Sequence, residues 1–268
     1  MIASRFKNFI FRILQQPFLQ GLYEIVHLLF LRAMNFGGGA DLINSGEKKA
    51  LEFAAEKLLG NKEIVILDAG ANLGEFSRLA HQIFTKPGIN LKIFAFEPLT
   101  PTFGALKNNL QAFGNISLIK QALGERAGQV SLYGVKNESG LTSVYKRNLE
   151  FAGKQTELAE TVAMTTLDEF CSANSIQTVD YLKLDVEGHE LFVLKGASNL
   201  IANGKIRFLQ FEFGGANIDS KTYFKDFYYL LSPKYNLYRI LSTGLWPLRE
   251  YKEIYEVFLT SNYLAVLK

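Results

Sequence analysis

The chain has 268 residues, of which 48% are hydrophobic and 21% are charged. This composition excludes an intrinsically disordered chain and allows one large domain with a sizeable core. The net charge is 29 − 26 = +3, which is too small to indicate a nucleic-acid-binding protein, and we expect none.

Cysteine and histidine are scarce. The single cysteine, Cys171, cannot form an internal disulfide, and three histidines leave little material for a histidine-rich metal centre. We expect Cys171 to be a small apolar filler near a helix end. Because disulfides are rare in reducing compartments and no signal cleavage site follows the apolar N-terminus, we expect a cytoplasmic protein.

Residues 1–40 are predicted to form a helical N-terminal extension, followed by one domain over residues 41–268. Residues 6–14 are apolar with basic residues interleaved, the pattern of an amphipathic helix. Residues 18–34 are apolar but interrupted by charges, and the run is short for a bilayer span. Packing of this extension on the domain is the first interpretation, and peripheral membrane or protein contact through residues 1–34 is the alternative.

The domain alternates helices and strands. Ser45 is a plausible N-cap for a helix that reaches Leu59. Apolar runs then predict strands, separated by helical patterns, at 64–67, 91–96, 116–123, 181–184 and 206–213. The intervening helices are expected at 76–84, 101–113, 167–172 and from about 190. This order predicts a doubly wound α/β fold with a mostly parallel sheet.

Two regions depart from this rhythm. Short strand-like runs at 129–135, 141–145 and 160–165 surround the turn residues 137–140, and they predict a small hairpin-like β insertion. After a helix over 223–231, the runs 235–241 and 263–267 are expected to close the sheet as an antiparallel pair.

The loop after the first strand carries a glycine motif. Asp68, Gly70, Asn72 and Gly74 lie in a tight turn that leads into a helix, where glycine permits close backbone approach to a ligand. The G-x-x-x-G spacing differs from the dinucleotide and phosphate-loop motifs, and Glu75 would repel a pyrophosphate. A cofactor with a positive or zwitterionic group, such as S-adenosylmethionine, fits better.

Residues after the next strands fit the same ligand. Glu97 follows the second strand, where a carboxylate can accept hydrogen bonds from ribose hydroxyls. Ala122 and Leu123 come where an adenine ring would lie, and they are candidates for apolar contact.

The strongest cluster follows the fourth strand. Asp185, Glu187 and His189 are expected at the cleft, and Glu190 is expected to stabilise the first turn of the next helix. Histidine has a pKa suited to accepting a proton from a hydroxyl, and Asp185 could orient it, bind substrate or help hold a divalent metal. Glu212 lies between aromatic residues after the fifth strand and is predicted in the substrate pocket.

Together these segments resemble the FkbM-type methyltransferases. The resemblance rests on the segments 67–77, 96–98, 166–168, 183–190, 194–197 and 211–212, and it covers roughly residues 45 to 215. It implies a Rossmann-type, class I methyltransferase-like fold and S-adenosylmethionine-dependent methylation, usually of an oxygen on sugars, glycans or natural products. Asp68, Gly70, Asn72 and Gly74 would then line the methionine end and Glu97 the ribose, with residues 185–190 facing the acceptor.

Methyl transfer from a sulfonium needs an aligned acceptor and, for an alcohol, removal of its proton. We expect His189, or alternatively Glu187, to take the proton, while Asp185 and Glu212 hold a small-molecule or saccharide acceptor. In a metal-assisted alternative, Asp185 and neighbouring carboxylates hold Mg²⁺.

Two other functions remain open from the sequence. A nicotinamide-dependent oxidoreductase would have a similar sheet, but the G-x-G-x-x-G motif is missing. A non-catalytic scaffold could bind a partner through the N-terminal helix and the aromatic residues of 223–229, although that spacing is also typical of a helix core. The acceptor and the oligomeric state are not predicted.

Overall fold

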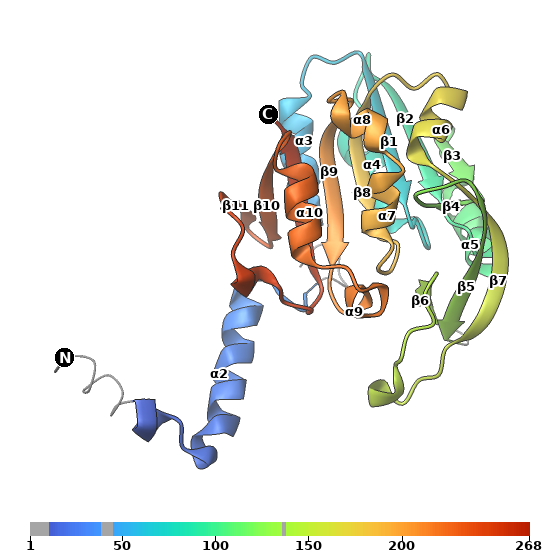
Figure 1. The fold of residues 1–268 in the computed structure, drawn as a ribbon. Coiled ribbons are helices and arrows are strands. Elements are labelled where there is room, and N and C mark those ends of the chain that lie inside the picture. The colour runs from blue at the N-terminus through green and yellow to red at the C-terminus, as the bar shows by residue number, and fades with distance from the viewer. Residues whose placement is uncertain (1–10, 39–44, 136–137) are drawn as a thin grey trace.

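The computed structural model describes residues 11–38, 45–135 and 138–268. Within these residues, an eight-stranded sheet has the order β11-β10-β12-β9-β8-β1-β2-β3 (Figure 1). The strands are β1 (Glu63–Ala69), β2 (Asn90–Phe96), β3 (Ile116–Ile119), β8 (Val179–Leu184), β9 (Ile206–Phe213), β10 (Tyr235–Leu241), β11 (Gly244–Leu248) and β12 (Ser261–Leu267). The five strands from β3 to β9 are parallel, which confirms the predicted doubly wound fold.

Helices cover both faces of the sheet. Alternate residues of β1 point to opposite faces: Ile64 and Ile66 pack against α3 (Glu47–Lys57) and α4 (Glu75–Phe84), near α5 (Thr100–Leu110). Val65 and Leu67 belong to the core on the other face, beneath the helices α6 (Leu167–Ala173), α7 (Glu190–Lys195), α8 (Ser198–Ala202) and α10 (Phe224–Leu231). A β-branched run buried on both sides is therefore explained by two helical layers.

A second sheet lies beside the first, with the order β4-β7-β5-β6. Its strands are β4 (Ala122–Leu123), β5 (Gly128–Val135), β6 (Glu138–Ser143) and β7 (Glu157–Thr165), with the short helix η2 (Glu150–Ala152) between the last two. The single strand predicted over 116–123 is wrong, because β3 pairs with β2 whereas β4 pairs with β7. The predicted hairpin-like insertion is a four-stranded sheet, and residues 136–137 of its turn lie outside the described part.

The C-terminal strands pair as predicted. β12 lies antiparallel between β9 and β10, and β11, which the sequence did not predict, adds an edge strand to β10. The segments α9 (Ala216–Ser220) and η3 (Glu253–Tyr255) lie near the same end of the sheet as the cavity described below. Gly46, one residue after the predicted Ser45, is the N-cap of α3, while the Ser45 hydroxyl accepts the backbone N–H of Glu47, the first residue of this helix, at 3.3 Å.

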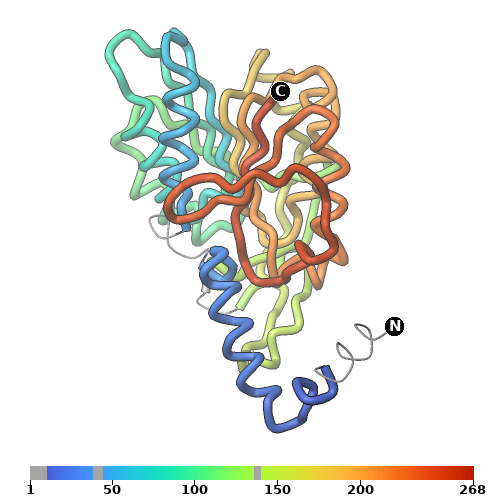
Figure 2. The backbone as a smooth tube through the Cα atoms, turned by 90° about the vertical axis from the view of Figure 1, so that its left-hand side faces the viewer, coloured from blue at the N-terminus to red at the C-terminus, as the bar shows by residue number. Residues whose placement is uncertain are grey.

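The N-terminal segment projects from this body. After η1 (Pro17–Leu19), helix α2 (Gln20–Ala33) extends away from the two sheets, as Figures 1 and 2 show from two directions. The predicted helix over 6–14 is described only from residue 11 onward. Of the described helices, none combines the length and the apolarity needed to cross a bilayer.

Candidate active site

A cavity of about 680 Å³ opens at the carboxyl ends of the parallel strands. Ligands of open α/β sheets bind at this edge, where the strand order reverses, and here the reversal falls between β1 and β8. Most of the predicted site residues line the cavity: Gly70, Asn72, Glu97, Ala122, Leu123, Asp185, Glu187, His189 and Glu212.

The loops after β1 and β8 touch each other at Gly70. A Cβ atom at this position would overlap the carbonyl oxygen of Asp185, and Gly70 has a φ of +81°, which favours glycine. The backbone N–H of Asp185 donates to the carbonyl of Ala69 at 3.0 Å. The glycine motif and the acidic cluster therefore form one wall, although about 115 residues separate them in the chain.

Asp68 and Gly74 are not among the residues that line the cavity, and their predicted contact with the cofactor stays a prediction. The Asp68 carboxyl is fully buried behind the wall, where Oδ2 accepts a hydrogen bond from the Ser77 hydroxyl at 2.7 Å. Burial raises the pKa of this carboxyl, and nearby Lys183 opposes the rise. Gly74 starts α4, and its Cα faces the side chains of Leu106 and Leu110. Asp68 and Gly74 therefore stabilise the glycine turn by contacts inside the protein, with Ser77 and with Leu106 and Leu110.

Glu97 lies at the end of β2 with its carboxyl group at the cavity. Its two oxygens accept backbone N–H groups from Asn72 at 3.1 Å and from Leu99 at 2.9 Å. Burial raises the pKa of Glu97 to about 7, against these hydrogen bonds, which lower it. The carboxylate is therefore fixed in place and retains lone pairs for a ligand. Ala122 and Leu123, from β4, are buried in the opposite wall.

A buried lysine, whose role the sequence reasoning missed, connects the carboxylates. The Nζ of Lys183, on β8, lies 3.1 Å from Oδ2 of Asp185 and 5.0 Å from the centre of the Phe76 ring. Burial alone would lower the pKa of Lys183, but Asp185, Glu47 and Asp68 outweigh it and raise the pKa. Lys183 within the strand predicted over 181–184 was the signal in the sequence, since a buried charge needs partners.

Glu47 at the start of α3 was also missed. Its carboxyl group lines the cavity and accepts hydrogen bonds from Ser45 Oγ and from Gln210 Nε2. Burial raises its pKa, and Lys183 lowers it. No local motif marks this residue, because the fold brings it to the site from the helix before β1.

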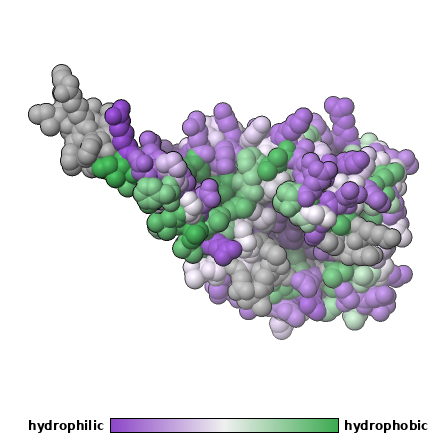
Figure 3. Space-filling model, turned by 90° about the horizontal axis from the view of Figure 1, so that it is seen from below, coloured by the Kyte–Doolittle hydropathy of each residue, from purple (hydrophilic) through white to green (hydrophobic). Residues whose placement is uncertain are grey.

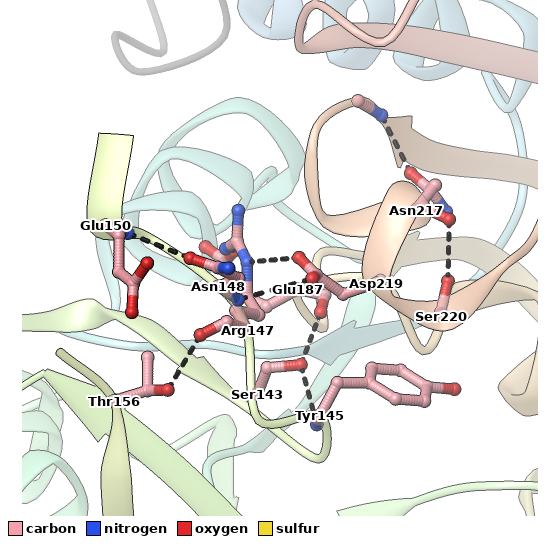
Figure 4. A network of polar contacts seen from close by, with 12 residues as sticks. Ser143, Tyr145, Arg147, Asn148, Glu150, Thr156, Glu187, Asn217, Asp219 and Ser220 are labelled. Carbon is pink, nitrogen blue, oxygen red and sulfur yellow. Dashed lines mark hydrogen bonds and ion pairs between the residues drawn. The ribbon is translucent and has the colours of Figure 1, made fainter. Parts of the chain in front are cut away.

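Glu187 is held by a network that reaches from the second sheet (Figure 4). Arg147 Nη1 donates to its Oε2 at 2.7 Å, and Arg147 Nε lies 3.4 Å from Asp219 of α9. The Ser143 hydroxyl donates to the Glu187 carbonyl at 2.6 Å. Burial and the charge of Asp185 raise the pKa of Glu187 to about 8, although Arg147 lowers it.

His189 lines the cavity but is packed tightly. Its Nδ1 lies 2.9 Å from the hydroxyl of Tyr145, and its ring stacks on Phe192 at 4.9 Å. Nε2 is buried beside Gly124 and has no hydrogen-bond partner in the described part of the chain. Burial lowers the pKa of His189 to about 4, so the ring is neutral at physiological pH.

The remaining two acids differ in role. Glu190 was expected to stabilise the first turn of its helix, and in the structure its Oε1 accepts the backbone N–H groups of Val186 and Gly188, in the loop before that helix. Burial raises the pKa of Glu190 to about 7. Glu212 faces the cavity from β9, and burial together with the charges of Asp185 and Glu187 raises its pKa well above the usual value. Among the described residues, no group of three or more His, Cys, Asp or Glu side chains is arranged to hold a metal ion, so the metal-assisted alternative gains no support.

A doubly wound sheet with a cavity between the glycine turn after β1 and the acidic loop after β8 has the Rossmann-like fold. Among proteins of this fold, the chain belongs to the FkbM methyltransferase family, since the model of the methyltransferase FkbM domain matches residues 68–240. This match confirms the family resemblance seen in the sequence, and it favours methyl transfer over the nicotinamide alternative.

Two curated relatives are similar over part of their length. The hexuronic acid methyltransferase AglP of Haloferax volcanii is 27% identical over 157 residues, which are 58% of this chain and 58% of that protein. The 2-O-methyltransferase NoeI of Sinorhizobium fredii is 26% identical over 165 residues, or 58% of this chain and 65% of that protein. The match therefore spans less than two thirds of each relative. A crystal structure of an FkbM methyltransferase from Methylobacillus flagellatus has a TM-score of 0.46 at 18% identity, and the match covers 77% of this chain and 45% of that one.

Proposed function

We propose that this protein is an S-adenosylmethionine-dependent methyltransferase that methylates a hydroxyl group of a saccharide, glycan or natural product. The observation that carries the proposal is the cavity at the switch point, where Gly70 lets the glycine turn after β1 meet the acidic loop after β8. The wall next to β1 and β2 then carries groups that can bind a nucleoside, and the wall next to β8 and β9 carries groups that can bind a polyol.

The residues on the β1 and β2 side fit the cofactor. Glu97 presents a fixed carboxylate for ribose hydroxyls, and Ala122 and Leu123 offer an apolar surface for a base. The surplus of carboxylates over cations around the cavity complements a positively charged sulfonium. When bound, the cofactor supplies a methyl group that is already activated for transfer.

The residues on the β8 and β9 side fit a hydroxyl-bearing acceptor. Asp185, Glu187 and Glu212 can accept or donate hydrogen bonds to an alcohol, depending on their protonation. The names of the curated relatives, a hexuronic acid methyltransferase and a 2-O-methyltransferase, support a saccharide as the acceptor class.

For the proton acceptor we favour Glu187 over His189. The Nδ1 of His189 faces Tyr145 and its Nε2 is buried beside Gly124, so its lone pair is poorly placed for an acceptor and its basicity is low. Glu187 is a stronger base than an ordinary carboxylate and is oriented by Arg147. His189 would then act through packing and through Tyr145.

Titration calorimetry with S-adenosylmethionine tests the proposal. We expect micromolar binding by the wild type and binding weaker by about tenfold or more in Glu97→Ala, which loses charge-assisted hydrogen bonds. Glu63→Ala, which removes an exposed carboxylate at the other end of β1, should bind as the wild type does. Absence of binding by the folded wild type would contradict the proposal and favour the scaffold alternative.

Two further parts of the proposal rest on sequence alone. The cytoplasm is the proposed place of action because a single cysteine is typical of a reducing compartment. Nucleic acid is not the proposed substrate, because the net charge is close to zero for a chain of this size.

A further inference from the structure

Helix α2 exposes an unusual amount of apolar surface. Leu31 is its one buried residue, whereas the side chains of Leu22, Ile25, Val26, Leu28, Leu29 and Phe30 are all exposed. Phe18 in the preceding turn is 81% exposed. Figure 3 shows this hydrophobic surface continuing along the helix away from the body. An apolar patch of this extent on a projecting helix indicates a surface that contacts another protein or a membrane.

The apolar side chains occupy a wide arc of the helix. At about 100° per residue, the exposed positions from Leu28 round to Phe30 cover roughly 200° of the circumference. Gln20, Glu24 and His27 lie on the remaining side, whereas Arg32, in the last turn, falls within the arc. A helix that pairs with one other helix needs a narrower stripe, whereas a helix lying in the headgroup region buries a broad apolar face and keeps a polar one in water.

The base of α2 is tied to the body at the rim of the cavity. Asn35 Nδ2 donates to the carbonyl oxygens of Ser45 and Ile240, at 2.8 and 3.0 Å. The Gly37 N–H donates to the carbonyl of Thr260 at 2.7 Å, and both of these residues line the cavity. In Figure 3, a polar hollow lies in the face from which the helix projects. A surface that binds α2 would therefore lie close to the cavity opening.

The charge of the chain is concentrated in the same segment. Residues 1–38 contain one acidic residue, Glu24, and four basic residues, of which Arg5 and Lys7 precede the described part, and this gives 4 − 1 = +3. The other 230 residues contain 25 basic and 25 acidic residues, because 29 − 4 = 25 and 26 − 1 = 25. The whole net charge of the protein therefore comes from the apolar extension, and this combination complements an anionic lipid surface.

We propose that α2 and the described residues before it dock the protein on an anionic membrane surface, with the cavity opening directed toward the lipid headgroups. A second copy of the chain fits less well, since two segments of equal positive charge repel and the apolar arc is wider than a helix pair can cover. The proposal does not depend on the proposed enzymatic activity.

Vesicle flotation of the full chain tests the proposal. Vesicles of phosphatidylcholine are compared with vesicles that also contain phosphatidylglycerol, at low and at high salt. The Ile25→Glu/Leu29→Glu double variant removes two exposed side chains of α2, and Leu59→Glu is the matched control. Leu59 is an equally exposed leucine that precedes β1, at the edge of the sheet away from the cavity. All three proteins are first checked for folding by circular dichroism.

We expect the wild type and Leu59→Glu to float with the anionic vesicles, more weakly at high salt, and the double variant to bind about tenfold or more weakly. Equal binding to neutral vesicles, no binding to either kind, or unchanged binding of the double variant would overturn the proposal. So would a dimer in sedimentation velocity that the double variant abolishes, in the absence of vesicle binding.

Discussion

Two residues that line the cavity have a positive φ, a backbone conformation that residues other than glycine rarely adopt. Asn72 has a φ of 47° and Glu187 a φ of 51°, and each such residue costs about 1–3 kcal/mol unless its surroundings impose the conformation. At Glu187 two contacts hold this conformation, since Ser143 donates a hydrogen bond to its carbonyl and Arg147 donates one to its carboxylate. Glu187 lines the cavity, and a strained backbone at this position agrees with the proposed chemical role.

We expect Glu187→Gln to lower kcat for methyl transfer by about 100-fold, the usual contribution of a general base, with little change in cofactor affinity. His189→Ala should lower kcat by less than about tenfold, because the histidine contributes packing in our proposal. Steady-state kinetics with a radiolabelled methyl group measures kcat for both variants and so distinguishes the two candidate bases. A larger loss in His189→Ala than in Glu187→Gln would restore the histidine as the base.

Arg147 is expected to tune Glu187 through its charge. The guanidinium lowers the pKa of Glu187, so its removal in Arg147→Met should raise that pKa further. If ionised Glu187 is the active form, the acid limb of the kcat/KM profile moves to higher pH in this variant. Arg207→Met, which removes an exposed arginine paired with Asp180, is the control with an unchanged limb. If the acid limb of the kcat/KM profile stays in place in Arg147→Met, Arg147 does not influence the proton transfer.

At the scale of elements, the contact between the loops after β1 and β8 is the most sensitive point of the fold. Gly70→Ala places a methyl group against the Asp185 carbonyl and strains a positive φ, so it should lower the free energy of unfolding by roughly 3 kcal/mol or more. Gly60→Ala is the matched control, since φ is also positive but no atom lies within 4 Å, and the cost should be about 1 kcal/mol. Urea unfolding measures the free energy of unfolding of both variants. An equal loss in Gly70→Ala and Gly60→Ala would show that the loops after β1 and β8 can move apart to accommodate the methyl group.

The elements that sequence predicted best are those whose signal is local. The run Ile64–Leu67 of β1 indicates a buried strand because its apolar residues continue without interruption, and β8 and β9 remain mostly apolar although Lys183 and Glu212 interrupt them. The division of 116–123 into β3 and β4 was missed, because it depends on pairing with β7, about 40 residues further on. β11 was missed as well, since Pro247 within the run argues against a strand unless the strand lies at an edge, as it does.

The site shows the same limit. Residues that directly follow a strand could be predicted, because strand ends meet at one edge of the sheet, and Glu97, Asp185 and Glu187 were found in this way. Glu47 and Arg147 could not, because each comes from an element whose position depends on the tertiary fold. For Asp68 the sequence could not predict how its carboxyl group is bound, since Oδ2 accepts the Ser77 hydroxyl and the buried Oδ1 has no partner among the described residues.

At the scale of the whole molecule, the buried carboxyl groups determine how stability depends on pH. Burial raises the pKa values of Glu97 and Glu190 to about 7 and that of Glu187 to about 8, from an ordinary value of 4.5. The folded chain then binds more protons than the unfolded chain at neutral pH, so stability falls as pH rises through these folded-state pKa values.

We therefore expect the Tm of the free protein to fall by several degrees between about pH 5 and about pH 8, because the three carboxyl groups together outweigh the buried His189, whose lowered pKa acts in the opposite direction. Glu190→Gln removes one of the titrating groups and should show a shallower decline. Differential scanning calorimetry across this window measures the trend, and a Tm that rises with pH would contradict the assignment of raised pKa values.

Cys171 has a consequence for the study of α2. The sole thiol of the chain is buried in α6, and burial raises its pKa to about 12, so the reactive thiolate is scarce and shielded in the folded protein. A single cysteine introduced at an exposed position of α2 would then be the one site that a maleimide fluorophore or a nitroxide spin label modifies. Without any prior removal of natural cysteines, the depth of α2 in a lipid layer becomes measurable by fluorescence quenching or by spin-label accessibility.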